Sequence, residues 1–452
     1  MPNASTFDAS GNTLIGDQHR RRIRVMLWVA SGLLTGEGIG WAIYFLQRGA
    51  WNIVAMDLFM MALGISGGVL TYLRRTRAAF FLIGGSIFLL VCGVSLVLDV
   101  PSAMAPRSTH HFLLVLAVAS LLFLRDEGAT LRYVVTGGCF VAFVVLASTS
   151  MGIASDYALP DSVRIGGTWA NNFFAAAGLY ALIHIIVSDF AEHFAMEMDL
   201  RKGIARGEFF LLYQPQVTSE GRVFGAEALL RWRHPTQGLV QPDEFIPLAE
   251  QSGLILPLGA WVLGAACEQL VLWSRREDMA ELTLSVNVSV HQFRRPDFVQ
   301  QVASVMERTG VSARRLKLEL TESSLVHDME DIIRKMAALK AMGVGFSLDD
   351  FGTGYSSLNY LKRLPLDQLK IDKSFVCDVL SNPNDAAIAH MVIDLGKNLG
   401  FSVLAEGVET HGQRDFLEQN GCHLFQGYLF SRPIPLQQFT EYCSRHYDGK
   451  HD

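Results

Sequence analysis

The chain has 452 residues, of which half are hydrophobic and only 18% are charged. This composition is apolar for a soluble protein and indicates membrane-spanning segments, and the length leaves room for two or three domains. A formal net charge of −6 argues against DNA as a partner, and six scattered cysteines without a CxxC pair argue against a zinc site or a disulfide framework.

The first half of the chain has the pattern of a helical membrane bundle. A polar N-terminal tail, residues 1–24, is rich in arginine at its end and is not followed by the cleavage site of a signal peptide. Six apolar stretches come next, over residues 25–46, 53–73, 78–98, 111–124, 133–153 and 169–188. Most have the roughly 20 residues that a helix needs to cross the hydrocarbon core, whereas the fourth is short. We therefore predict a six-helix transmembrane sensor or anchor region over residues 25–188.

Basic residues in the loops predict the orientation of these spans. They cluster before the first span, between the second and third, and between the fourth and fifth: Arg20, Arg21, Arg22, Arg24, Arg74, Arg75, Arg77, Arg125 and Arg132. The other three loops hold only Arg48, Arg107 and Arg164. Because basic residues accumulate on the cytoplasmic side, we expect the N-terminus and, after six crossings, the second half of the chain in the cytoplasm.

Ionisable side chains within the predicted spans are candidates for function, because they are costly in a membrane. They are Glu37, Asp57 and His184, with His110 and His111 at the start of the fourth span. The two carboxylates lie toward span ends and fit the headgroup region. The histidines are possible ligands of a haem or a metal ion, but we favour a sensor or anchor whose ligand the sequence does not identify.

Residues 189–207 join the two halves. Phe190, Phe194, Met198 and Ile204 recur at nearly helical spacing among charged residues, which predicts a short amphipathic linker helix that continues from the last span. Two interpretations of this helix stay open: it pairs with a copy of itself, or it is a spacer.

From residue 208 to 452, short apolar runs alternate with longer helical patterns, as in βα units. The expected strands are Phe209–Gln214, Ala226–Trp232, Thr283–Val288, Leu316–Leu320, Val344–Leu348, Gln368–Ile371, Ser402–Ala405 and Leu424–Gln426. The expected helices include Ala260–Arg275, Asp297–Arg308, Asp331–Ala341 and Ala386–Leu399. This pattern predicts a TIM-type (β/α)8 barrel, so the fold class is an α-helical membrane bundle followed by an α/β barrel.

Nearly every expected strand ends in a side chain of the kind that binds metals or phosphate. These side chains are Glu227, Asn287, Glu319, Asp349 with Asp350, Lys370, Glu406 and Gln426. In a TIM-type barrel the carboxyl ends of the strands converge on one mouth. Carboxylate and amide oxygens at one mouth favour Mg²⁺ or Mn²⁺ over zinc.

The adjacent pair Asp349 and Asp350 is central to this hypothesis. On a regular strand the two would point to opposite faces, but where the chain turns into a glycine loop both can be aimed into one site. Taken alone, the pair fits a capping turn as well as a metal site. Together with the other strand ends it favours two ions about 3.5–4 Å apart, which stabilise the attacking and leaving oxygens at phosphorus. Lys370 would then orient the water, and Arg231 would hold a phosphate.

Residues 200–445 resemble the EAL domain family of bacterial cyclic di-GMP phosphodiesterases. The motifs that carry the resemblance occur in order: Tyr213-Gln214-Pro215, EALLRW, NVS, ELTES, DDFGTGYSSL, KID, AEGVE and QGY. The family implies a TIM-like barrel with a modified first strand, which is often dimeric. It also implies hydrolysis of cyclic di-GMP to linear pGpG with Mg²⁺ or Mn²⁺, and inhibition by Ca²⁺.

The resemblance also implies roles for residues at the matching motif positions. Two metal ions would be held by Glu227, Asn287, Glu319, Asp349, Asp350 and Glu406. The expected catalytic residues are Lys370, which positions the nucleophilic water, with Glu406, Glu227 and Asp349. The residues expected to contact the substrate or its site are Arg231, Gln214 and Gln426, and those expected to hold the glycine loop after Asp350 are Glu322 and Glu409. No departure from the family pattern occurs at these positions.

The resemblance and the predicted spans together imply a cyclic di-GMP phosphodiesterase in the bacterial cytoplasmic (inner) membrane. Its activity would be tuned by the membrane region, and it would form a homodimer through the barrel and the linker helix. The alternative is a catalytically silent cyclic di-GMP receptor that signals across the membrane. The complete set of ligand-type residues favours the enzyme.

Overall fold

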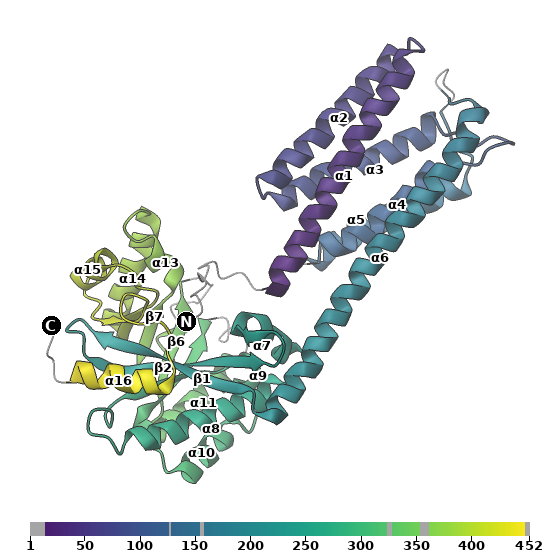
Figure 1. Ribbon diagram of the computed structural model, residues 1–452. Coiled ribbons are helices and arrows are strands. Elements are labelled where there is room, and N and C mark those ends of the chain that lie inside the picture. Colours follow the sequence, from purple (N-terminus) through teal and green to yellow (C-terminus); the bar gives the residue numbers. More distant parts are fainter. Residues whose placement is uncertain (1–13, 126–127, 154–157, 323–327, 353–360, 448–452) are drawn as a thin grey trace, which may run out of the picture. The chain divides into compact units, whose positions relative to one another are not determined.

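The computed structural model describes residues 14–125, 128–153, 158–322, 328–352 and 361–447, and the chain divides into two compact units, Met1–Ala195 and Met196–Asp452 (Figure 1). The division falls inside the predicted linker, residues 189–207. These residues, up to Arg206, are helical and continuous with the preceding apolar stretch, because α6 (Asp161–Arg206) begins in the first unit and ends in the second.

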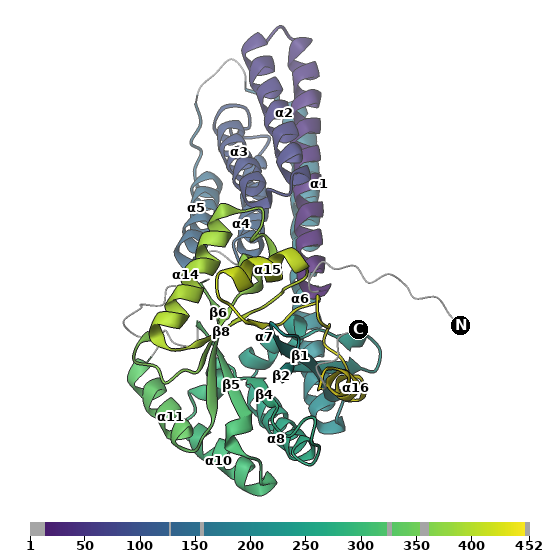
Figure 2. The same ribbon diagram turned by 90° about the vertical axis from the view of Figure 1, so that its left-hand side faces the viewer.

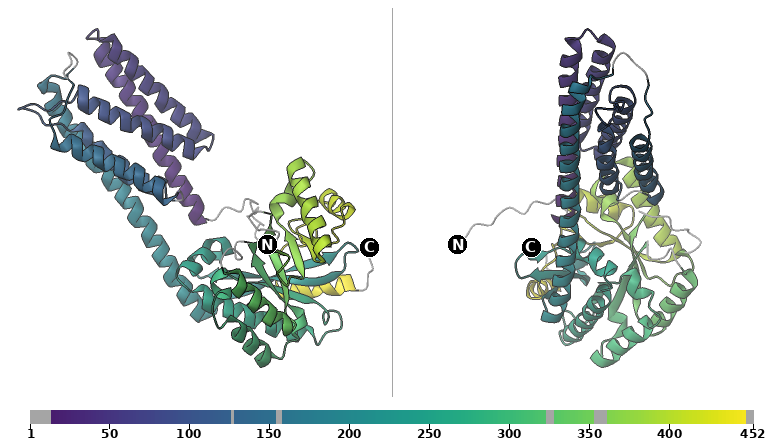
Figure 3. Two further views of the ribbon diagram at one scale, coloured as in Figure 1. Left: turned by 180° about the vertical axis from the view of Figure 1, so that it is seen from behind. Right: turned by 90° about the vertical axis from the view of Figure 1, so that its right-hand side faces the viewer.

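The N-terminal unit is entirely helical in its described residues, as Figure 3 shows in purple to blue. Its elements are α1 (Leu14–Leu46), α2 (Trp51–Tyr72), α3 (Thr76–Val97), η1 (Thr109–His111), α4 (Phe112–Phe123), α5 (Ala129–Ser148) and the first part of α6. The helices α1 and α2 approach closely through small residues, since a side chain at Gly38 would lie 2.6 Å from the carbonyl oxygen of Asp57. Such close packing of small residues is typical of helix pairs in membranes.

Six helices among the described residues are long and apolar enough to cross a membrane, but they are not the six predicted spans. Five are in the N-terminal unit: residues 23–46 of α1, and α2, α3, α5 and α6. The sixth is α8 (Ile255–Trp273), which belongs to the barrel and is half buried there. The predicted fourth span remains short, because residues 109–123 extend about 22 Å against a hydrocarbon core of about 30 Å.

The C-terminal unit is a closed barrel, as predicted. Its strands are β1 (Phe209–Thr218), β2 (Val223–His234), β3 (Gly238–Val240), β4 (Thr283–Asn287), β5 (Leu316–Thr321), β6 (Gly345–Phe351), β7 (Gln368–Ile371), β8 (Ser402–Ala405) and β9 (Leu424–Phe425). Their order is β1-β9-β8-β7-β6-β5-β4-β2-β3, and pairing of β1 with β2 closes the ring. The first strand is the modified one, because β1 runs antiparallel to both neighbours while β2 and β4–β9 are parallel. The sequence pattern missed β3, a short strand that pairs only with the end of β2.

Helices surround the barrel, and Figure 2 shows α10, α11 and α14 on its outer side. They are α7 (Pro242–Gln251), α8, α9 (Val290–Phe293), α10 (Phe298–Thr309), η2 (Ala313–Arg315), α11 (Met329–Ala341), α13 (Lys373–Cys377), α14 (Pro383–Leu399), α15 (His411–Gln419) and α16 (Leu436–Tyr447). The four helices named from the sequence are confirmed as α8, α10, α11 and α14, with ends shifted by a few residues.

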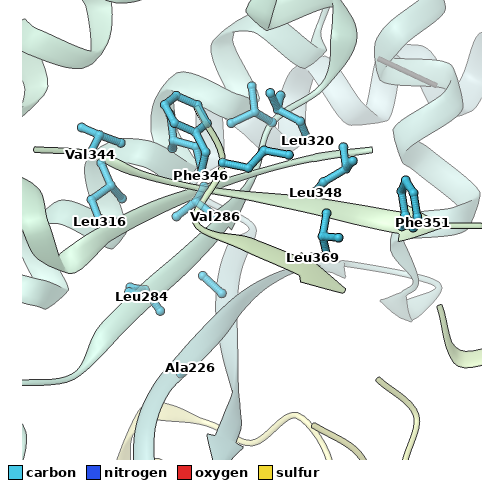
Figure 4. Packing of buried hydrophobic residues seen from close by; sticks show 14 of the residues in the cluster. Ala226, Leu284, Val286, Leu316, Leu320, Val344, Phe346, Leu348, Phe351 and Leu369 are labelled. Atoms are coloured by element: carbon cyan, nitrogen blue, oxygen red, sulfur yellow. The ribbon is translucent and has the colours of Figure 1, made fainter. Parts of the chain in front are cut away.

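The apolar core lies between the strands and these helices. Alternate residues of the strands point outward into it, for example Leu316 and Leu320 of β5 and Phe346 and Leu348 of β6 (Figure 4). The residues between them face the barrel interior, and Glu319 of β5 is one of these. The barrel interior is therefore lined largely by polar groups, which positions chemistry inside it.

Candidate active site

The centre of the candidate site is the ammonium group of Lys370 on β7, which is fully buried. Its Nζ lies 2.5 Å from Glu319 Oε2, 3.4 Å from Asp349 Oδ2 and 3.5 Å from Glu227 Oε2, and it is ion-paired with Glu406 Oε1. These carboxylates come from β5, β6, β2 and the residue that follows β8. The structure thus gathers four of the predicted site residues around the nitrogen of a fifth.

Burial and mutual charge shift the protonation of this cluster. Burial raises the pKa of Glu319 to about 7, with Glu227 and Asp349 adding to the shift and Lys370 opposing it. Burial also raises the pKa of Glu406 well above its ordinary value, again opposed by Lys370. Burial alone would lower the pKa of Lys370, but the surrounding carboxylates outweigh it and raise that pKa. The lysine therefore stays charged, and its single ammonium group is shared by four carboxylates.

The donor atoms fit divalent metal ions. Four carboxylates surround the single lysine ammonium in the described part of the site, and Asp350 follows Asp349 directly in the chain, so acidic groups are in excess. Glu319 Oε1 is buried and has no hydrogen-bond partner among the described residues, although buried polar atoms in proteins are normally paired. As the side chains stand, no three or more His, Cys, Asp or Glu in the described residues are placed to hold a metal ion. Because Lys370 Nζ occupies the point where the carboxylates meet, binding of an ion requires some of them to turn away from it.

Amide side chains orient Glu227. Asn287 Nδ2 donates to Glu227 Oε1 at 2.6 Å, and Gln426 Nε2 donates to Glu227 Oε2 at 2.6 Å. Burial alone would raise the pKa of Glu227, but Lys370 and these hydrogen bonds lower it overall. Gln426 Nε2 also donates to Gln214 Oε1 at 3.1 Å. Two predicted residues, Asn287 and Gln426, therefore hold one carboxylate ionised and in a fixed orientation.

The two adjacent aspartates lie at an irregularity in β6. Leu348 pairs with Leu369 and Phe351 pairs with Ile371, so β6 carries one residue more than β7 over this interval. The extra residue is accommodated by Asp350, whose φ of 55° is left-handed. Such a bulge changes the alternation of side chains and re-aims them, which is how both carboxylates reach the mouth.

Asp350 faces a carboxylate that the sequence analysis did not include in the site. Burial raises the pKa of Asp350 to about 6, with further contributions from Asp349, from Asp372 and from a hydrogen bond shared with Asp372. Asp372 is half-buried and also caps α13, since its Oδ1 accepts from Ser374 N at 2.9 Å. Its position two residues after Lys370, in the KID motif, was the available signal.

Arg231 lies apart from the carboxylate cluster. It is half-buried on β2, on the same face as Glu227 because the two are four residues apart in a strand. Its Nη1 donates to Leu230 O at 2.8 Å. Burial lowers its pKa, while Glu227, Tyr428 and Asp243 raise it. A half-buried guanidinium beside the mouth is suited to bind a phosphate group.

The two loop-holding glutamates differ in their surroundings. Glu322 is buried, and its Oε2 accepts from the backbone N–H of Gly352 at 3.2 Å, two residues after Asp350. Glu409 is exposed, and its backbone N–H donates to Gln413 Oε1 at 2.8 Å in the start of α15. The glycine loop that both were predicted to hold continues into residues 353–360, which lie outside the described residues.

The histidines of the membrane half do not share one site. His110 is buried and stacks on Phe143, with ring centroids 5.2 Å apart, and His111 lies beside it. Asn171 of α6 contacts Ser108, and His184 follows 13 residues later on the same helix, which is about 20 Å along its axis. A common haem or metal site of all three is therefore not formed. Asp57 is buried, and Glu37 is exposed on α1.

Fold and site together define a class: an α/β barrel whose first strand is reversed and whose strand ends surround a buried lysine with carboxylates. The family model described as the EAL domain matches residues 197–433, more than half of the chain. The chain therefore belongs to the EAL domain family.

Relatives extend the comparison. The bifunctional diguanylate cyclase/cyclic di-GMP phosphodiesterase MucR of Pseudomonas aeruginosa is 45% identical over 241 residues, covering 53% of this chain and 35% of MucR. The cyclic di-GMP phosphodiesterase NbdA of the same organism is 45% identical over 251 residues, covering 55% of this chain and 32% of NbdA. The match thus spans about a third of the length of these relatives. A solved structure of the PaMucR phosphodiesterase in complex with c-di-GMP has a TM-score of 0.53 at 44% identity, covering 54% of this chain and 99% of that one.

Proposed function

We propose that this protein is a membrane-anchored phosphodiesterase that hydrolyses cyclic di-GMP to linear pGpG. The observation that carries the proposal is the ring of Glu227, Glu319, Asp349 and Glu406 around the buried ammonium of Lys370. Support comes from the names of the relatives, which are cyclic di-GMP phosphodiesterases, and from the solved relative in complex with c-di-GMP.

Two Mg²⁺ or Mn²⁺ ions would be held by Glu227, Asn287, Glu319, Asp349, Asp350 and Glu406. When bound, such ions act as Lewis acids on a phosphoryl oxygen and lower the pKa of bound water. Glu319 Oε1 supports this assignment, because it is buried with no hydrogen-bond partner in the described part of the chain and a cation would satisfy it.

The chain's own residues position the substrate and balance its charge. Lys370 keeps its proton, because its pKa is raised, so it can position the attacking water and offset negative charge that develops at phosphorus. Asn287 and Gln426 hold Glu227 in place. Arg231 binds a phosphate group of the substrate, and Gln214 contacts the substrate or its site.

The membrane region places the barrel in the cytoplasm of a bacterial cell, at the inner membrane, where it tunes the activity. The arginine distribution supports this orientation, provided that the short segment of η1 and α4 crosses the membrane. A homodimer would form through the barrel and the end of α6, where Phe190 and Phe194 are exposed one helical turn apart.

The test uses the full chain purified in detergent. Incubation with cyclic di-GMP and either Mg²⁺ or Mn²⁺ should yield pGpG, which chromatography separates from the substrate, and chelation of the metal should stop the reaction. Binding of cyclic di-GMP without any product in the presence of both metals would identify a receptor instead of an enzyme.

A further inference from the structure

Gln216 is a fully buried amide on β1, inside the barrel. It lies two residues after Gln214, so both side chains point to the same side of the strand. Opposite Gln216 on β2 stands Gly225, where a side chain would lie 2.8 Å from the carbonyl oxygen of Thr283. The absence of a side chain at Gly225 leaves room for the amide of Gln216.

Gln216 begins a relay of hydrogen bonds that ends on a predicted metal ligand. Its Nε2 donates to Gln426 Oε1 at 3.0 Å. Gln426 Nε2 in turn donates to Glu227 Oε2 at 2.6 Å and to Gln214 Oε1 at 3.1 Å. The participating glutamines and Glu227 are all buried.

The relay decides which end of the Gln426 amide faces Glu227. An ionised carboxylate only accepts hydrogen bonds, so it needs the NH₂ group of Gln426 and not its oxygen. The donation from Gln216 supports this orientation, because it satisfies the oxygen of Gln426 on the opposite side. With the Gln426 amide reversed, its oxygen would meet the carboxylate of Glu227, and the hydrogen bond to that carboxylate would be lost.

The side-chain oxygen of Gln216 makes no hydrogen bond in the described residues that would draw the amide away from Gln426. Gln216 Oε1 is buried and has no hydrogen-bond partner among the described residues. The contact with Gln426 is thus the polar interaction that holds this side chain, and removing it affects the site through Gln426 alone.

We propose that Gln216 is a positioning residue of the candidate metal site, which orients Glu227 through the amide of Gln426. The proposal rests on the proposed function in so far as Glu227 is a metal ligand. Residues that orient ligands from behind typically contribute about 10–100-fold to metal affinity.

The experiment measures Mn²⁺ binding to the full chain in detergent, by the electron paramagnetic resonance signal of free Mn²⁺. Gln216→Met, which keeps the volume and removes the donor, should weaken binding about 10-fold, and Gln426→Met should weaken it at least as much. The double variant should bind no more weakly than Gln426→Met alone, because the first residue acts only through the second. The control is Gln269→Met on α8, a buried glutamine outside the site, which should bind Mn²⁺ as the unaltered chain does.

Two results would overturn the proposal: unchanged Mn²⁺ binding in Gln216→Met, or effects of the two substitutions that add in the double variant. If Gln216→Met does not fold, Gln216→Leu replaces it, since this apolar side chain also has no group that can donate a hydrogen bond. If the unaltered chain binds Mn²⁺ normally but forms no pGpG, the proposed phosphodiesterase activity is refuted. The Mn²⁺ titration of the variants would still decide whether Gln216 positions the metal site.

Discussion

Lys370 Nζ donates to Glu319 Oε2 at 2.5 Å, and both side chains are closed to solvent. Taking two charges out of water is costly, and their attraction offsets that cost only when the geometry is good and the remaining groups are paired. Here one ammonium group faces four carboxylates. When no other cation is bound, the stability of the barrel therefore depends on the positive charge of Lys370.

Replacing Lys370 by Met should therefore destabilise the barrel most strongly without metal. Loss of one partner of a buried ion pair costs about 3–5 kcal/mol. Barrel unfolding can be followed by the reactivity of Cys267, Cys422 and Cys443, which are buried in this unit. We expect the variant to unfold at a lower temperature in a chelator, and Mn²⁺ to recover more stability in the variant than in the unaltered chain. Equal unfolding of both proteins in the chelator would contradict this account.

Removal of a metal-binding oxygen should abolish turnover. Asp349→Ala and Glu227→Ala each remove a carboxylate that contacts Lys370. Each should lower the rate of pGpG formation by more than about 100-fold, which is more than the loss typically caused by changing a residue that only orients a metal ligand. Asp394→Asn, at an exposed position on α14, is the matched control and should keep its rate. Near-normal rates in both alanine variants would refute the two-metal assignment.

Much of the barrel was predictable, because alternating apolar residues on strands such as β5 reveal which side faces the helices. The positions of the carboxylates followed from the convergence of strand ends. The bulge was not predictable, since the left-handed φ of Asp350 depends on how β6 pairs with β7. Gln216 was missed for a related reason: its partner Gln426 is 210 residues away in the chain, so only the closed barrel brings them together.

Glu322 offers a test of the loop that follows the aspartates. Its carboxylate accepts from Gly352 N, so Glu322→Leu leaves that N–H without this acceptor and should lower turnover about 10-fold, which corresponds to roughly 1.4 kcal/mol. Mn²⁺ affinity should change little, because Glu322 is not an expected ligand. Glu322→Gln keeps an oxygen in the same place and should retain most of the activity. A loss of Mn²⁺ binding as large as that of Asp349→Ala would show that Glu322 acts on the metals directly.

The orientation of the chain depends on the short segment formed by η1 and α4, and cysteine labelling can decide whether it crosses the membrane. Cys377 on α13 is exposed, whereas the other five cysteines are buried or half-buried. If the barrel is cytoplasmic, a membrane-impermeant maleimide should label Cys377 in permeabilised spheroplasts and not in intact ones. In a Cys377→Ser background, Ala103→Cys and Gly128→Cys place exposed thiols before and after the segment.

Labelling of these two positions should differ because a crossing separates them. We expect Ala103→Cys to react in intact spheroplasts and Gly128→Cys only after permeabilisation, in agreement with the arginines near Gly128 at Arg125 and Arg132. The Cys377→Ser chain without added cysteines gives the background. Reaction of both positions in intact spheroplasts would mean that the segment does not cross. The barrel, two crossings after Gly128, would then lie outside on the opposite side from the N-terminus, and Cys377 would react in intact spheroplasts, away from any cytoplasmic supply of cyclic di-GMP.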